Sequence, residues 1–323
     1  MRTSVLRTVR PIVLFCFVTL FSIRSFSQSI TLANGKLEVG LGLGPAFFLG
    51  DLGGNHGKGT TFIKDVNLPL TKLSKGVFIN FFPAEWIGFR IAANHSQLEG
   101  IDSLIKNTGG AEIFRKRRNL TFRSNVTEAY VAIELYPTFF MEKFDGLIGK
   151  LRPYGIVGVG AFRYNPQGLY FEPSGSSKWV DLRPLKLEGQ GMAEYPDRKP
   201  YNLTQIEIPM GFGAKYYIKE NMYIGFEILH RKTFTDYVDD VSTRYIDPAY
   251  FDVYLTPEQA MMAKQLAFRE DFNNPQASRP YINDQRGDPK DNDAFFSSII
   301  RMGWRLGGSN PGVLKQMRCP VFY

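Results

Sequence analysis

Cysteine and histidine are both scarce in this chain. Its 323 residues include two cysteines, Cys16 and Cys319, and three histidines, His56, His95 and His230. No histidine has a second histidine four residues away or a cysteine nearby, so the usual zinc-site spacings are absent. We therefore expect no metal site, no cofactor and no catalytic residue set.

Long apolar runs are also absent beyond the N-terminus. No stretch of roughly 18 apolar residues follows residue 27, which excludes a transmembrane helix there. The first 27 residues combine Arg2, Arg7 and Arg10 with a short apolar run at 12–21, and Ser25 and Ser27 supply small residues for cleavage before position 28. This pattern predicts a signal peptide at 1–27. An uncleaved anchor is the alternative, and the shortness of the run argues against it.

The charge of the chain is only mildly unbalanced. The formal net charge is +8, and four of the arginines lie in the first 27 residues without any acid, which leaves +4 on the rest. That excess is too small to indicate nucleic-acid binding. Cys16 leaves with the signal peptide. The remaining Cys319 has no partner for an intrachain disulfide.

Eight segments alternate between apolar and polar residues with the period of a β-strand. They cover 36–49, 76–82, 87–97, 128–136, 154–164, 205–215, 224–231 and 295–306. One face of each is apolar, and the other carries glycines and charges of both signs. Mixed charges in mid-strand fit the crowded interior of a narrow barrel, where acids and bases pair. The expected interior charges are Glu38, Arg90, Glu128, Glu134, Glu207, Lys215, Glu227, Arg301 and Arg305.

Aromatic residues gather near the strand ends, which favours a membrane barrel over a soluble sandwich. We interpret them as two interfacial girdles. One comprises Phe81, Phe82, Trp86, Phe139, Phe140, Tyr216, Tyr217, Tyr223 and Trp304, and the other comprises Phe47, Phe48, Tyr164, Phe234, Phe295 and Phe296.

The connections alternate in length as well. The joins at 83–86 and 219–221 are short, the join at 137–153 is intermediate, and those at 50–75, 98–125, 165–203 and 235–294 are long. Short turns face the periplasm and long loops face outward in bacterial barrels. The sequence thus predicts an all-β fold, a small antiparallel transmembrane barrel of eight strands at 28–306, with a periplasmic tail at 307–323. Its location would be the outer membrane of a Gram-negative bacterium.

One helix is expected within the long outer loops. Thr256, Pro257 and Gln259 form an N-terminal capping pattern before an amphipathic stretch at 260–268. The glycine-rich segment 53–60 lacks the first glycine and the hydroxyl residue of a phosphate loop, so it reads as a turn-rich outer loop.

Two loop clusters are candidates for chemistry. His230 is close in sequence to Asp236, Asp239 and Asp240, which makes this the best catalytic or calcium candidate, although solvated loop acids beside an interfacial histidine are favoured. The basic run contains Arg115, Lys116, Arg117 and Arg118. It either meets lipopolysaccharide phosphates at the outer surface or is merely solvated.

Several segments resemble one family of Bacteroidetes outer-membrane barrels, the PorG-like barrels. They lie at 42–52, 117–124, 179–191, 199–206 and 231–243, and the resemblance covers essentially the whole mature chain. The matching loop residues include Asp51, Arg117, Arg118, Trp179, Asp181, Gly189, Gln190, Gly191, Thr235, Asp236, Asp239 and Asp240.

The resemblance implies a non-enzymatic component of the type IX secretion machinery, which in related bacteria also supports gliding motility. It implies outer-membrane lipid and a periplasmic ring of PorK and PorN type as partners. Eight strands enclose room for side chains only, which excludes a protein-conducting pore. The join at 141–150 and the tail from 307 are the candidate ring contacts. Two alternatives remain open, a surface binding barrel of an unrelated pathway and a small outer-membrane hydrolase using His230 and the nearby acids.

Overall fold

A computed structural model describes residues 37–52, 70–84, 86–104, 112–137, 151–219, 221–269 and 280–306. The expected signal peptide, the segment at 53–60, the join at 141–150 and the tail at 307–323 lie outside these residues. The strands are β1 Leu37–Leu49, β2 Lys72–Ala84, β3 Ile87–Ile101, β4 Thr121–Leu135, β5 Leu151–Arg163, β6 Pro166–Phe171, β7 Ser177–Asp181, β8 Thr204–Lys219, β9 Met222–Thr233 and β10 Ala294–Leu306.

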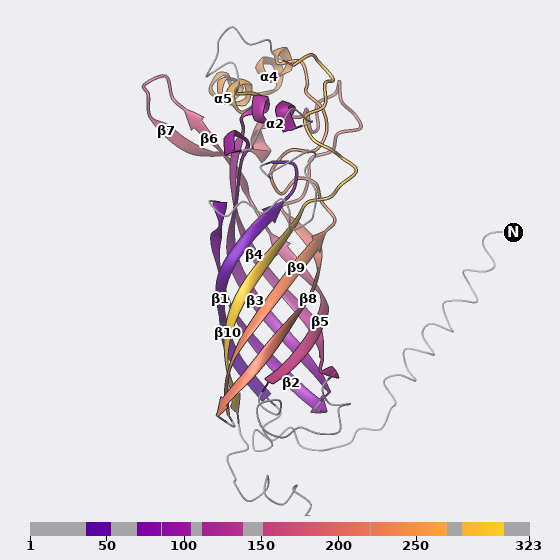
Figure 1. Ribbon diagram of the computed structural model, residues 1–323. Helices are drawn as coiled ribbons and strands as arrows, with labels where there is room; N and C mark the ends of the chain where they lie inside the picture. The colour runs from indigo at the N-terminus through magenta and orange to yellow at the C-terminus, as the bar shows by residue number, and fades with distance from the viewer. Residues whose placement is uncertain are drawn as a thin grey trace, which may run out of the picture.

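Eight of these strands form a closed antiparallel barrel, which confirms the predicted fold (Figure 1). The order of pairing is β3-β2-β1-β10-β9-β8-β5-β4, and pairing of β3 with β4 closes the ring. The first and last strands pair along their whole length, from Leu37 opposite Leu306 to Leu49 opposite Ala294. β6 follows β5 and pairs with the first residues of β4, and β7 pairs with β6, so these two strands form a hairpin beyond the barrel wall.

Strand alternation separates an apolar outer surface from a charged interior. On the outer surface Leu41, Ile91 and Ile300 are between 55% and 63% exposed, whereas the intervening Arg90 and Arg301 are each 1% exposed. An apolar surface that encircles a barrel is not stable in water, and hydrocarbon is the environment that suits it. The chain is therefore a transmembrane barrel. No helix in the described part of the chain has the length and hydrophobicity to cross a bilayer.

The described parts of the long loops fold into a compact cap at one end of the barrel, above the strands in Figure 1. The cap comprises α2 (Glu112–Arg118), the β6–β7 hairpin with the segment leading to β8, and the segment between β9 and β10 that holds α4 (Ala249–Tyr254) and α5 (Pro257–Ala267). We call this the capped end, and the opposite end, where β2 joins β3 and β8 joins β9, the turn end. The cap has its own apolar core, in which Leu182, Leu185, Phe251 and Leu266 are buried.

The predicted helix is present as α5. Its Thr256 side chain accepts a hydrogen bond from the Gln259 amide, and the Gln259 side chain accepts one from the Thr256 amide, which completes the capping box. The sequence did not predict α2, α4 or the β6–β7 hairpin. Several of the predicted strands are also too short, since β2 begins at Lys72 and β4 begins at Thr121.

The girdle interpretation is wrong for about half of the aromatic residues. Trp86, Tyr216 and Phe234 are exposed as expected, but Tyr223, Tyr164 and Phe295 are at most 1% exposed and point into the barrel. Phe82 and Tyr217 also pack against the interior, and Phe48 packs against buried residues at the capped end. Phe139 and Phe140 lie outside the described residues. The inward-facing rings fill the two ends of the lumen instead of contacting lipid headgroups.

Candidate functional site

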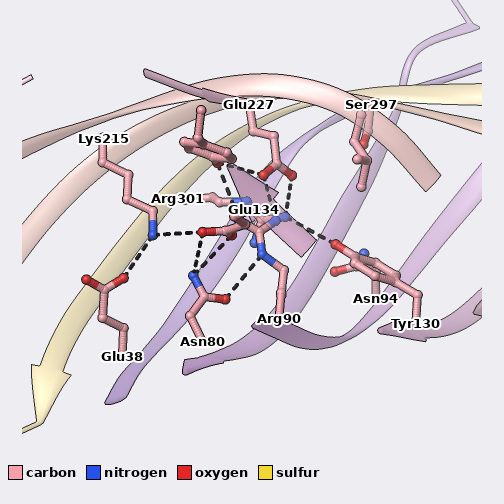
Figure 2. A network of polar contacts seen from close by, with 12 residues as sticks. Glu38, Asn80, Arg90, Asn94, Tyr130, Glu134, Lys215, Glu227, Ser297 and Arg301 are labelled. Carbon is pink, nitrogen blue, oxygen red and sulfur yellow. Dashed lines mark hydrogen bonds and ion pairs between the residues drawn. The ribbon is translucent and has the colours of Figure 1, made fainter. Parts of the chain in front are cut away.

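All nine predicted interior charges lie inside the barrel. Eight are buried, and Arg305 near the turn end is partly buried. Figure 2 shows the central group, in which side chains from opposite walls meet in the middle of the lumen. We call this group the lumen network and define it as Glu38, Asn80, Arg90, Glu134, Lys215, Glu227 and Arg301.

Every charge in the lumen network has an oppositely charged partner. Arg90 bridges Glu134 and Glu227, and its Nη1 lies 2.6 Å from Glu227 Oε2. Arg301 Nη2 lies 2.5 Å from the other oxygen of Glu227. Lys215 Nζ lies 2.9 Å from Glu38 Oε2 and 3.3 Å from Glu134 Oε2. Buried charges are tolerated only when paired and hydrogen-bonded in this way.

A second interior group lies closer to the capped end. Arg231 Nη2 lies 2.5 Å from Glu128 Oε1, and Asn94 donates to the same oxygen. Glu207 is buried nearby, and its carboxyl group lies close to that of Glu128. Near the turn end, Arg305 Nη2 lies 3.1 Å from Glu38 Oε1.

Aromatic rings close the lumen on both sides of these charges. On the turn-end side Lys215 lies over the rings of Phe82, Tyr136, Tyr154 and Tyr223, at 4.8–5.5 Å from their centroids. These contacts are cation–π interactions. At the capped end, stacked rings of Tyr164, Tyr201 and Tyr237 cover the mouth. The lumen is therefore filled by side chains.

Arg118 in the cap is a structural residue and not part of a surface basic run. It is 2% exposed, its Nε and Nη2 bond both oxygens of Asp102, and its other bonds go to the main-chain oxygens of Arg286 and Asp51. This geometry removes Arg118 from the predicted lipopolysaccharide contact. Lys116 and Arg117 are exposed on α2, and Arg115 is partly buried.

A second buried ion pair joins distant segments of the cap. Glu188 Oε1 lies 2.8 Å from Arg286 Nη1, and its two oxygens also accept the main-chain amides of Ser242 and Thr243. Arg286 in turn donates to the Asp240 carbonyl. Neither Asp102, Glu188 nor Arg286 was among the predicted site residues, because loop ion pairs leave no periodic pattern in the sequence.

The loop acids after β9 are buried, so their interpretation as solvated residues is wrong. Asp236 is 6% exposed, and Asp239 and Asp240 are fully buried. Asp239 accepts the amides of Leu52 and Val241, and Asp240 accepts the Tyr201 hydroxyl. The main-chain amide of Asp293 donates a hydrogen bond to the main-chain carbonyl of Thr235. The loop is thereby tied to the rim of β1 and to the start of β10.

The remaining family-like residues shape the hairpin and its exit. Trp179 on β7 stacks under Arg123, whose guanidinium lies 4.3 Å from the ring centroid. Asp181 accepts the side-chain amides of Asn165 and Gln167. Gly189 and Gly191 have φ angles of 80° and 75°, which residues other than glycine rarely adopt. Gln190 between them is buried. Asp51 accepts the Asp288 amide.

His230 does not join the loop acids. Along β9 the neighbouring Arg231 points into the lumen, so His230 lies on the outward face, half-buried beside β8 and β10. Within the described residues no hydrogen bond connects it to Asp236, Asp239 or Asp240. The same residues contain no group of three His, Cys, Asp or Glu side chains arranged to hold a metal.

Burial makes the cap acids hard to ionise. It raises the pKa of Asp51 to about 6, against the opposing effect of Arg118, and the pKa of Asp240 to about 7, against that of Arg286. Burial, together with repulsion from Asp51, raises the pKa of Asp236 to about 10. Each group therefore retains a proton in the folded cap at a pH where the unfolded chain has lost it.

We expect the cap to lose stability as the pH rises, in buffers without divalent cations. A carboxyl whose folded pKa is raised stabilises the fold fully below its unfolded pKa, and this contribution is lost as the pH rises through the folded value. The urea midpoint of the cap should therefore fall between pH 5 and pH 8. This midpoint can be measured from the fluorescence of Trp179 in a variant that carries Trp86→Phe and Trp304→Phe.

The Asp240→Asn variant is the control for this pH dependence. It removes one titrating group with a folded pKa of about 7, so its midpoint should change less between pH 5 and pH 8 than that of the parent. A parent midpoint that stays constant or rises over this interval would contradict the prediction.

No protein-family model matches the sequence, and no curated protein matches it. Among solved structures, Neisserial surface protein A is 7% identical, with a TM-score of 0.36 over 84% of this chain and 97% of that one. A major outer-membrane protein of Thermus thermophilus is 8% identical, with a TM-score of 0.37 over 83% and 98%. OprG of Pseudomonas aeruginosa is 11% identical, with a TM-score of 0.32 over 84% and 97%. Similarity this low says nothing about function, and the barrel assignment rests on the strand pairing.

Proposed function

We propose that this chain is a non-enzymatic scaffold in the outer membrane of a Gram-negative bacterium. It would be a component of the type IX secretion machinery, and of gliding where that occurs, and it would anchor a periplasmic ring of PorK and PorN type. The observation that carries the proposal is the filled lumen, where Arg90, Lys215 and Arg301 are held between buried acids. A barrel with no open channel acts through its surfaces. The loop segments that resemble PorG-like barrels supply the choice of machinery.

A filled lumen predicts a barrel that does not conduct ions. The purified protein, reconstituted in a planar bilayer in 1 M KCl, should give no stable conductance steps above the leak. The Glu227→Ala and Arg301→Ala double variant, which removes two central side chains, is the comparison that should conduct if the network is the seal. Stable open channels in the unaltered protein would contradict the sealed-lumen argument.

The position of the partner distinguishes a scaffold from a surface binder. A photo-cross-linking residue at Lys219 or Asn221 reports on the turn end, and one at Val253 on α4, which is 71% exposed, reports on the capped end. In cells of the native host we expect the ring lipoprotein to cross-link from the turn end. Cross-links from the capped end alone, to an external ligand, would favour the surface binding barrel.

Two genetic tests complete the experiment. Deleting the gene should abolish export of proteins that carry a C-terminal sorting domain, while an unrelated outer-membrane barrel still assembles. Ending the chain at Leu306 should weaken ring association while the barrel still inserts. Normal co-purification of the truncated chain with the ring would exclude the tail as a contact.

Contact with lipopolysaccharide phosphates remains a proposal for α2 alone. Lys116 and Arg117 are exposed there, and cationic side chains bind phosphate through charge-assisted hydrogen bonds. Replacing both with glutamine should lower binding of the purified barrel to lipid A vesicles without altering its unfolding. The hydrolase alternative is not favoured, because His230 lies on the outward face of β9.

A further inference from the structure

Four carboxyl groups from three separate segments meet at the rim where the cap joins the barrel. Asp51 follows β1, Asp236 and Asp239 follow β9, and Asp293 precedes β10. Main-chain contacts bring them together, since Leu52 donates to Asp239 Oδ2 and Val238 donates to Asp293 Oδ2. We call this group the rim acids.

The rim acids have oxygens left without partners. Asp236 is 94% buried, since its exposed fraction is 6%, and neither of its oxygens has a hydrogen-bond partner of ordinary geometry within the described residues. Ser242 is near enough to favour its charged form. Asp293 is 1% exposed, and its Oδ1 is also without a partner. That oxygen lies against the Gly50 backbone, where a Cβ would be 2.1 Å away. Buried polar oxygens of this kind are rare in folded proteins and need a proton, a water molecule or an ion as a partner.

The nearby arginines are occupied elsewhere. Arg118 donates hydrogen bonds from its Nε and Nη2 to Asp102 and from its Nη1 and Nη2 to main-chain oxygens. Arg286 pairs with Glu188. The rim acids are therefore opposed by one nearby cation, Arg118, which acts on Asp51 and Asp239 but forms its own side-chain bonds elsewhere. Buried carboxylates in that situation either take up protons or coordinate a metal ion.

We propose that the rim acids bind one calcium ion, with Asp236 and Asp293 as its carboxylate ligands. Main-chain carbonyls and water would complete the coordination, which for calcium comprises six to eight oxygens in flexible geometry. Asp51 and Asp239, whose oxygens already accept main-chain amides, contribute negative charge. This site has two carboxylate ligands and not three. It is consistent with the absence of any ready-made three-residue metal group among the described residues.

Calcium suits this site better than the alternatives do. All available donors are oxygens, which disfavours zinc and copper, and magnesium gives up its own water reluctantly. The raised pKa values of the two ligand carboxyl groups are consistent with a cation site. Burial and mutual repulsion raise the pKa of Asp236 to about 10, and raise that of Asp293 well above its ordinary value. The ion would displace these protons, so binding should release protons and strengthen as the pH rises.

The test is calcium titration of the full-length barrel in detergent, after removal of divalent ions with EDTA, by isothermal calorimetry in two buffers of different ionisation heat. We expect one saturable site with a Kd of about 10⁻⁴–10⁻³ M, the range of extracellular calcium modules. Proton release should appear as a difference in heat between the buffers. Magnesium should bind at least about tenfold more weakly.

Asp236→Asn and Asp293→Asn are the test variants, and Asp252→Asn, an exposed α4 carboxylate paired with Lys264, is the matched control. We expect each test variant to weaken binding at least about tenfold and the control to leave it unchanged. Heat-dependent gel mobility verifies that each barrel is folded. No saturable binding by the unaltered protein at 10 mM calcium, or unchanged binding in both test variants, would overturn the proposal and leave protons as the occupants.

Discussion

Replacing Glu227 with leucine should destabilise the barrel by about 3–5 kcal/mol, the usual cost of removing one member of a buried ion pair. Glu227 is the only partner of Arg301 and one of two partners of Arg90 among the ion pairs of the described residues. Its loss leaves two guanidinium groups buried in the lumen with a single remaining acid. The urea midpoint of the barrel in lipid vesicles, followed by tryptophan fluorescence, measures the effect.

Two further variants separate charge from shape. Glu227→Gln keeps the size of the side chain and part of its hydrogen bonding. The stability of this variant should therefore lie between the stability of the parent and that of the leucine variant. Glu172→Gln removes a partly exposed acid at the tip of the β6–β7 hairpin, where its pair with Lys178 is solvated, and should leave the stability of the barrel nearly unchanged. If Glu227→Leu is as stable as the parent, the lumen network does not hold the barrel together.

Replacing Arg118 with methionine should destabilise the cap by a similar amount, about 3–5 kcal/mol, while the barrel remains folded. The change removes the Arg118 guanidinium from buried Asp102 and from two main-chain oxygens to which it donates. Hydrogen exchange is the appropriate measurement, because it reports the cap and the barrel separately. The Leu120 amide, which donates to Asp102, should exchange much faster, and amides within β9 should not.

Lys116 provides the matched control for this substitution. It lies two residues before Arg118 on α2 and is exposed, so Lys116→Met should alter cap stability by no more than about 0.5 kcal/mol. Arg118→Lys keeps the charge but loses the bidentate geometry of the guanidinium. Its loss of cap stability should lie between that of the control variant and that of Arg118→Met. Equal exchange rates in the Lys116 and Arg118 variants would show that the cap does not depend on this ion pair.

The sequence predicts the barrel well because strand alternation has one physical cause along the whole wall. Every second side chain faces lipid, so Leu41 and Ile300 on one side and Glu38 and Arg301 on the other are separated by period alone. The same rule, applied at the strand ends, would have placed Phe82 inside with Asn80, two residues before it. The girdle interpretation instead used residue type and ignored the face.

The cap could be predicted only in part. The capping box before α5 is a local signal, and the helix begins where that signal places it. The bonds of Arg118 with Asp102 and of Glu188 with Arg286 join residues 16 and 98 positions apart, across turns whose shape no local pattern specifies. For the same reason Asp236 and Asp239 looked like ordinary loop acids. Their burial depends on the packing of β1, β9 and β10 at the rim.

The pairing of β1 with β10 has a consequence for how the protein is made. Leu37 and Leu306 are neighbours in the wall, so the ring cannot close until nearly the whole chain is available. Lys215 on β8 meets its partner Glu38 only after that closure, since Glu38 lies on β1. Joining such distant segments carries a large entropic cost and is slow. Before this step the interior charges face solvent or an assembly factor, and no partly built wall can enter hydrocarbon without exposing them. Insertion and closure should therefore occur together.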